Sequence, residues 1–302
     1  MAKRKELKDG DDDVPMTDVA SRRQDAEDSG DDSGSSSEMD TINVDFEWFD
    51  PQPEYDFHGL KVLLRQLFDV DSQLFDLSAL ADMILAQPLL GSTVKVDGNE
   101  TDPYAFLTVL NLKEHKEKPA MKQVIQYLQK VASSRSSLSP LSELLSRPNY
   151  DIPPIGLILT ERLINVPPAV VPPMYTMLQE EIQWALEDKE PYEFTHYLII
   201  SKTYQEVESK LDMQESRPQK KQKKKTASSE RFYFHPEDEI LERHALCFSS
   251  FDYTIKQDEG LSDSKRAFQD LGIRPQGSLI LIDASKFGDA VKEMSDTFKP
   301  PA

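Results

Sequence analysis

The stretch Gly156–Tyr175 reads GLILTERLINVPPAVVPPMY and joins the two halves of the chain. It begins as an apolar, strand-like segment, passes through a charged turn, and contains the pairs Pro167-Pro168 and Pro172-Pro173 ahead of a helical run. Proline fixes φ and removes a backbone donor. We therefore expect a rigid strand-to-helix connection, with no regular element passing through the two pairs. Such a connection suits a recognition scaffold better than a mobile catalytic loop.

Outward from this stretch, apolar spacing predicts strands that alternate with helices. The predicted strands span 44–48, 92–96, 104–112, 155–163, 194–201, 231–235, 246–255 and 278–283. The predicted helices span 57–67, 76–87, 120–132, 140–147, 174–186, 236–243 and 284–298, with Asp56 and Asp76 as N-caps of the first two. Several neighbouring strands have no helix between them. The fold class expected is therefore α/β, with one mixed, mostly antiparallel central sheet flanked by helices.

Composition divides the chain into a tail and one domain. Residues 1–42 are rich in Asp, Ser and Gly and have no apolar periodicity, which predicts a disordered acidic tail. Residues 43–302 are expected to form a single α/β domain, interrupted by a disordered, lysine-rich linker at about 212–230. In the tail, Ser29, Ser35 and Ser37 each precede an acid by three residues and are candidate phosphosites, although an unmodified solubility tail explains the same pattern.

The formal net charge of −19 over 302 residues argues against a protein that binds DNA or RNA directly. A strongly acidic chain attracts basic partners, although the charge also serves solubility alone. The single cysteine, Cys247, lies in an apolar strand and is expected to be a core residue. No apolar run is long enough to cross a bilayer, so we expect a soluble intracellular protein without membrane contact.

A lysine cluster within the linker is the clearest short motif. The cluster consists of Lys220, Lys221, Lys223, Lys224 and Lys225. Five lysines in a polar linker are typical of a nuclear import signal that enters the acidic groove of an import receptor. The alternative is a solvated linker whose charge balances the acidic tail. No aromatic residue is interleaved with the lysines, which argues against nucleic-acid binding by this patch.

Catalytic motifs are missing from the sequence. It contains no glycine-rich phosphate loop, no Gly-x-Ser-x-Gly elbow and no His-Glu-x-x-His helix. His235 and His244 bracket a segment with the acids Glu237, Asp238 and Glu239, but a helix with acids in its first turn explains this pattern better than a metal site. We therefore predict no catalytic residue, no cofactor and no metal.

The polar residues of the Pro-Pro stretch are a candidate partner interface. The candidate set is Glu161, Arg162, Asn165, Pro167, Pro168, Pro172 and Pro173. Proline rings offer flat, dry surface beside these polar groups, which suits an interface edge. An internal hydrogen-bonded turn explains the same residues equally well, and the sequence leaves the two alternatives open.

Three segments carry a family resemblance. GLILTERLINVPPAVVPPMY, HYLIISKTY (His196–Tyr204) and FHPEDEIL (Phe234–Leu241) resemble the BCCIP family of eukaryotic nuclear proteins, with similarity from about Val44 to Asp283. The resemblance implies a fold similar to that of GCN5-related acetyltransferases. The cofactor turn of those enzymes is not matched, because its nearest counterpart, Arg274–Ser278, has one glycine and leads into a strand.

The same resemblance implies a function. Fungal members of the family act in nuclear export, including that of a phosphatidylinositol phosphate kinase, and as chaperones of universal large-subunit ribosomal protein fourteen. Animal relatives are tied to genome maintenance. We therefore expect a monomeric, non-enzymatic nuclear chaperone or escort that shuttles to the cytoplasm, supports 60S biogenesis, and meets a basic ribosomal protein, import and export receptors and a lipid kinase cargo. The alternatives are a karyopherin-linked export adaptor and an acetyltransferase-like enzyme.

Overall fold

One eight-stranded sheet organises the protein, with the strand order β1-β2-β3-β4-β5-β8-β7 and with β6 paired to β5. The computed structural model describes residues 44–87, 90–147, 151–206, 231–255 and 272–299. The predicted acidic tail and lysine-rich linker therefore lie outside the described residues. From Val44 onward the chain forms one compact unit.

The strands confirm a mixed, mostly antiparallel sheet. Their bounds are β1 (Glu47–Phe49), β2 (Ser92–Lys95), β3 (Ala105–Asn111), β4 (Ile155–Arg162), β5 (His196–Glu206), β6 (Arg231–Tyr233), β7 (Cys247–Phe251) and β8 (Ile273–Asp283). Strands β4 and β5 pair in parallel, and the other described pairings are antiparallel. The apolar strand predicted at the sheet centre is β5, which is flanked by β4 and β8.

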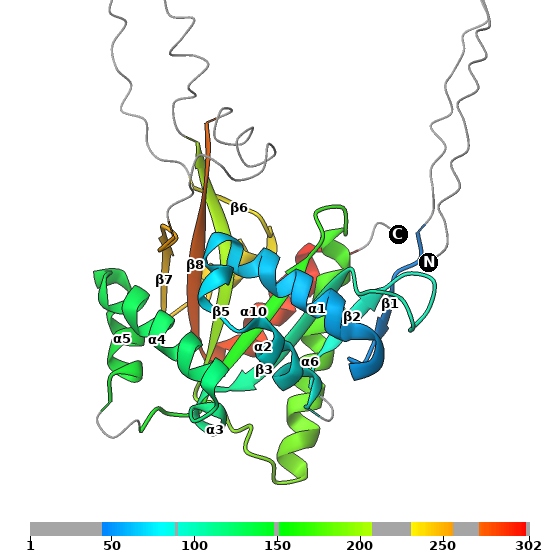
Figure 1. Ribbon diagram of the computed structural model, residues 1–302, viewed down its shortest axis with the longest axis horizontal. Helices are drawn as coiled ribbons and strands as arrows, with labels where there is room; N and C mark the ends of the chain where they lie inside the picture. The colour runs from blue at the N-terminus through cyan, green and yellow to red at the C-terminus, as the bar shows by residue number, and fades with distance from the viewer. Residues whose placement is uncertain (1–43, 88–89, 148–150, 207–230, 256–271, 300–302) are drawn as a thin grey trace, which may run out of the picture. The chain divides into compact units, whose positions relative to one another are not determined.

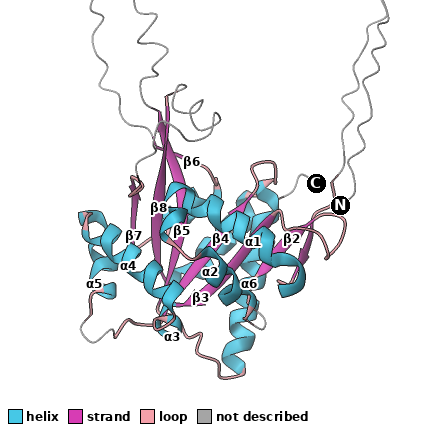
Figure 2. Ribbon diagram, viewed as in Figure 1, coloured by secondary structure: helices cyan, strands magenta, loops and turns pink. Residues whose placement is uncertain are grey.

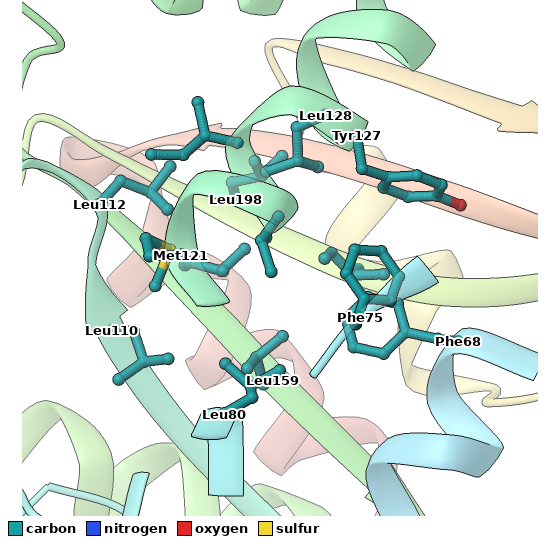
Figure 3. Packing of buried hydrophobic residues seen from close by; sticks show 14 of the residues in the cluster. Phe68, Phe75, Leu80, Leu110, Leu112, Met121, Tyr127, Leu128, Leu159 and Leu198 are labelled. Atoms are coloured by element: carbon teal, nitrogen blue, oxygen red, sulfur yellow. The ribbon is translucent and has the colours of Figure 1, made fainter. Parts of the chain in front are cut away.

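Helices cover both faces of the sheet (Figures 1 and 2). On one face lie α1 (Pro53–Phe68), α2 (Leu77–Leu85), α4 (Pro119–Ser133) and α5 (Ser139–Leu145), with the short helices α3 (Leu112–His115), η1 (Asp69–Leu74) and η2 (Ser136–Leu138). On the other face lie α6 (Val171–Glu187), α8 (Glu237–Arg243) and α10 (Ala284–Thr297). Figure 3 shows how Met121 and Leu80 from the helices meet Leu159 and Leu198 from the strands in the first core.

The structure corrects the prediction for the two proline pairs. A 3-10 helix, η4 (Pro168–Val170), follows Pro167 directly, and α6 already begins at Val171, so the second pair lies in its first turn. The first backbone N–H groups of a helix have no intrahelical partner, so proline costs little there. The strand, the connection and the helix follow in the expected order, but a regular element does pass through the prolines.

Asp76 accepts a hydrogen bond from the backbone of Ala79 at 3.0 Å, which confirms it as the N-cap of α2. The predicted N-cap Asp56 is wrong, because α1 begins at Pro53 and places Asp56 within the helix. There it is buried, 2.7 Å from Lys95 Nζ, and accepts a hydrogen bond from the backbone N–H of Gln52 at 2.6 Å.

Candidate functional site

The two central parallel strands separate before they end. The pairing of β4 with β5 runs from Ile155 opposite His196 to Leu159 opposite Ile200. Beyond this point β4 stays paired with β3, whereas β5 pairs with β8 and, over Thr203–Gln205, with β6. The ends of β4 and β5 therefore place side chains between the strands and the surrounding helices.

Polar residues occupy these strand ends at positions that continue the core pattern. Leu159 of β4 and Ile200 of β5 pack into the core beneath α1. Because side chains alternate with a period of two, Glu161 and Lys202 come next on the same face. Both side chains are buried, so their charges must be compensated within the protein.

Glu161 is the centre of a buried ion-pair network. Lys202 Nζ lies 2.5 Å from Glu161 Oε2, and His235 Nε2 lies 3.0 Å from Oε1. Gln66 of α1 donates to Glu161 Oε1 at 3.1 Å, and its backbone carbonyl accepts from Lys202 Nζ at 3.1 Å. The network therefore ties α1 to β4, to β5 and to the turn that precedes α8.

The opposite side chains of the same strand ends face α8. Arg162 forms a two-pronged ion pair with Glu237, and its Nη2 donates to Glu237 Oε2 at 3.0 Å. Ser201 of β5 donates to Asp238 Oδ2 at 2.5 Å. Glu237 and Asp238 stand in the first turn of α8, where the helix dipole favours negative charge. Both acids are buried, so they anchor the helix to the sheet.

The network shifts the pKa values of three of its members. Burial alone acts to raise the pKa of Glu161, but the contacts with His235 and Lys202 outweigh it and hold this pKa below its ordinary value. Burial acts to lower the pKa of His235, and its contact with Glu161 outweighs that effect and raises the pKa. Burial raises the pKa of Asp238 to about 7. The contact with the Glu161 carboxylate therefore favours the charged form of His235.

A pocket of about 800 Å³ opens onto this network. Its walls come from α1, η1, the turn after β4, the turn between β6 and α8, and the start of β8. Exposed apolar side chains surround it: Ile164 is 94% exposed, Val62 51% and Phe234 38%. Large apolar groups that gather in the open around a cavity are typical of a binding surface.

The predicted partner interface falls partly on this pocket. Glu161, Arg162 and Pro168 line it, and the turn that follows β4 contributes the exposed Ile164. The remaining candidates are Asn165, Pro167 and Pro173, which are exposed, and Pro172, which is buried in α6. Glu161 and Arg162 form internal contacts, and the turn beside them is exposed. Partner binding by these residues stays a prediction.

Other residues from the sequence lie elsewhere. Cys247 is buried in β7, and burial raises the pKa of its thiol. His244 follows α8 and contacts Glu293 of α10 at 2.6 Å, away from His235. Among the residues that the structure describes, no group of three or more His, Cys, Asp or Glu side chains could hold a metal ion. In the same residues, no helix is long and apolar enough to cross a membrane. The lysine cluster and the candidate phosphosites lie outside the described residues.

Sequence reasoning assigned only Glu161 and Arg162 of these contacts to a candidate site, and it did not assign Gln66, Ser201, Lys202, His235, Glu237 or Asp238. Only Lys202 carried a usable signal, because it continues the alternation of the apolar strand HYLIISKTY with a charge. Asp238 resembled an ordinary first-turn acid. Gln66 sits beside the apolar stripe of α1, and nothing local to the helix distinguishes it.

Together, the fold and the site define a mixed α/β protein whose central parallel strands end in a buried ion-pair network beneath an apolar pocket. Comparison with known proteins assigns the chain to a family. Residues 41–241 match the family described as BCCIP. The chain therefore belongs to the BCCIP family, as the three sequence segments indicated.

Fungal relatives extend the similarity over the whole chain. It is 68% identical to Protein bcp1 of Aspergillus fumigatus over 301 residues, which cover 100% of both chains. It is 50% identical to Protein bcp1 of Schizosaccharomyces pombe over 264 residues, covering 86% of this chain and 92% of the relative. The crystal structure of BCP1 from Saccharomyces cerevisiae matches with a TM-score of 0.58 and 30% identity, covering 88% of this chain and 93% of that one.

Proposed function

We propose that this protein is a non-enzymatic nuclear chaperone or escort that binds a basic ribosomal protein of the large subunit, universal family fourteen. In this role it supports 60S biogenesis and nuclear export. The observation that carries the proposal is the net charge of −19 in a member of the BCCIP family. Charge of this sign raises the rate at which a basic client is captured and holds off competing polyanions such as RNA.

The exposed apolar rim of the pocket supports a client-binding surface. Charge alone gives fast but weakly specific association, whereas apolar side chains that become desolvated supply the lasting contacts. Ile164 and Val62 project from different elements toward the same opening. A client that covers them would remove apolar surface from water without disturbing the buried network below.

The test is direct binding of the purified full-length protein to the purified ribosomal protein at low and high salt. We expect a one-to-one complex whose affinity falls steeply as salt rises. A paired Val62→Ser and Ile164→Ser variant should weaken the complex, whereas Trp184→Ser, which removes an apolar side chain that is 57% exposed on α6, should not. Affinity that is independent of salt would refute the electrostatic part. Equal effects of the two apolar variants would refute the pocket rim as the contact surface.

A karyopherin-linked export adaptor is the second candidate, and the lysine cluster is the feature that favours it. Substitution of Lys220, Lys221 and Lys223–225 should shift the protein to the cytoplasm if the cluster is the import signal. Affinity purification from nuclear extract separates the two functions. One small basic ribosomal protein in near-equal amount supports the chaperone, and a spread of transport factors without it supports the adaptor.

The implied relation to the GCN5-related acetyltransferase fold is a further part of the proposal, and it raises the third candidate, an acetyltransferase-like enzyme. The nearest counterpart of a cofactor turn, Arg274–Ser278, lies inside β8. A Cβ atom on Gly277 would lie 2.4 Å from Phe251 Cζ, so this glycine admits an aromatic ring. Calorimetric titration with acetyl-coenzyme A is expected to give no heat above dilution, and saturable heat would support the enzyme.

A further inference from the structure

Basic side chains outnumber acidic ones in the lining of the pocket, although the chain as a whole is strongly acidic. Two of its lining residues, Asp69 and Glu161, are acids, whereas Arg65, Arg162 and Lys202 are bases. Arg162 is paired with Glu237, so the bases open to an occupant are Arg65 and Lys202, and the contact of His235 with Glu161 favours its charged form. A negatively charged occupant therefore has partners in this pocket, even though the molecule as a whole repels anions.

The accessible parts of the network are its cations. The side chain of Glu161 is 0% exposed, whereas those of Lys202 and His235 keep 10% and 9% of their surface. Lys202 and His235 therefore line the pocket with some exposed surface, while the carboxylate that compensates them is covered. A cationic ligand finds no exposed carboxylate at Glu161.

Two positive groups retain capacity to bind an anion. Lys202 Nζ contacts Glu161 and the carbonyl of Gln66, and lies 5.6 Å from the ring centre of Phe234, so two of its three donors have strong acceptors. Arg65 is exposed at the pocket wall and makes no ion pair with any residue that the structure describes. An anionic group between them would accept charge-assisted hydrogen bonds.

The rest of the pocket lining favours a ligand with an apolar body. Ten of its nineteen lining residues are aliphatic, aromatic or proline, and Val62, Ile164 and Phe234 among them are exposed. The volume of about 800 Å³ is within the range of small-ligand pockets, roughly 300–1,000 Å³. Asp69, at the junction of α1 and η1, holds a φ of 48°, a strained value for a residue with a side chain, and such strain is common at binding sites.

We propose that this pocket is a binding site for a carboxylate carried on an apolar body, with the carboxylate directed to Arg65 and Lys202. The site lies inside the pocket whose apolar rim is the proposed client contact, and it goes beyond the chaperone function because its charge preference is opposite to that of a basic client. Two sources share this chemistry: a free organic acid, and the C-terminal residue of a peptide with an apolar side chain.

Calorimetry on the full-length protein distinguishes the two sources. The first pair of probes is decanoate and its neutral match, decanamide. The second pair is a short peptide that ends in phenylalanine and has no other charged group, as the free acid and as the C-terminal amide. We expect at least one acid to bind more tightly than its amide. If only decanoate does so, the ligand is a small organic acid, and if the peptide acid does so, it is a chain terminus. Equal binding of acid and amide, or no binding of any probe, would overturn the proposal.

Surface variants then place the binding event. Arg65→Gln should lower the affinity for the acid by about two- to fivefold, the range of an exposed charge contact, and leave the affinity for the amide unchanged. Ile164→Asp should lower the affinity for the acid further, because it adds a negative charge at the mouth of the pocket. Both positions are exposed, so folding is retained, and Arg147→Gln, an exposed arginine outside the pocket, is the matched control. A loss of affinity in the control equal to that in Arg65→Gln would place the acid elsewhere.

Discussion

Glu161 shows how one residue can be essential to the fold without being catalytic. Its carboxylate compensates Lys202 and His235, both buried, and also accepts from Gln66. Removing one partner of a buried network leaves the others without their counter-charge, which costs far more than the network contributes relative to an apolar core. The prominence of this residue in the sequence therefore reflects stability first.

Glu161→Gln should lower the free energy of unfolding by about 3–5 kcal/mol, because two buried cations lose their counter-charge. Urea denaturation followed by circular dichroism measures the change. Glu100→Gln, at an exposed loop position, is the control and should change stability by less than about 0.5 kcal/mol. A loss below about 1 kcal/mol for Glu161→Gln would show that the network is easily replaced.

The raised pKa of His235 gives the stability a pH dependence of known sign. The folded protein holds the imidazole proton more tightly than the unfolded chain, whose histidine has the ordinary value of 6.5. The contribution is complete below pH 6.5 and is lost as pH rises through the folded pKa. Asp238, whose pKa is raised to about 7, acts in the same direction at lower pH. Glu161, with a lowered pKa, acts oppositely, and only in acid below its ordinary value of 4.5.

We therefore expect the free energy of unfolding to decrease as pH rises above 6.5, by about 1.4 kcal/mol for each tenfold preference of the folded state for the proton. His235→Gln should flatten this dependence, whereas His58→Gln, at an exposed position of α1, should preserve it. If His235→Gln does not fold, an NMR titration of the imidazole in the unaltered protein measures the folded pKa directly. A value at or below 6.5 contradicts the prediction.

At the scale of elements, the start of α6 shows where sequence reasoning succeeded and where it failed. The Pro-Pro stretch predicted a strand, a rigid connection and a helix, and β4, η4 and α6 follow in that order. The prediction that no regular element passes through the proline pairs is wrong, because the first turn of a helix tolerates proline. Boundaries elsewhere shifted for tertiary reasons: β8 begins five residues earlier than expected, at Ile273, because its pairing with β5 runs to Glu206.

The site was less predictable than the fold. Apolar alternation identified β4 and β5, but the pairing partners of Glu161 depend on where α1 and the turn before α8 approach the strands. Gln66 and His235 are separated from Glu161 by 95 and 74 residues in the chain, and no local pattern connects them. The sequence therefore marked Glu161 as polar in an apolar context, and only the fold shows what compensates it.

Pro173→Ala tests the corrected view of this element. Pro173 is exposed in the first turn of α6. A backbone N–H at this position would have no intrahelical acceptor, so its absence in proline breaks no helix hydrogen bond. The substitution should cost only about 0.4–1 kcal/mol, through the greater freedom of the unfolded chain. Gln183→Pro, exposed but within the helix, should cost about 3 kcal/mol or more. Thermal denaturation compares the two, and similar losses would contradict the assigned helix start.

At the scale of the whole molecule, charge is divided between the tail and the folded domain. Residues 1–42 contain six Lys or Arg and thirteen Asp or Glu, so the tail carries −7 of the total −19. The larger share, −12, belongs to residues 43–302 and includes the lysine cluster. The proposed attraction of a basic client therefore has two sources, the tail and the domain, and the two have different expected effects on binding kinetics. Long-range steering acts on the association rate, whereas contacts in the bound state act on dissociation.

Deletion of residues 1–42 separates these sources. If the tail only steers the client, the association rate constant should fall several-fold at low salt, and the difference from the full chain should vanish at high salt. The dissociation rate constant should stay unchanged, because the pocket rim and the folded surface are intact. A variant in which the acids of the tail are replaced by their amides, at unchanged length, controls for loss of chain rather than of charge, and should reproduce the deletion. Stopped-flow mixing with the ribosomal protein measures both constants. Faster dissociation in the deletion would mean that the tail contacts the bound client, and equal association rates would mean that the domain alone supplies the electrostatic attraction.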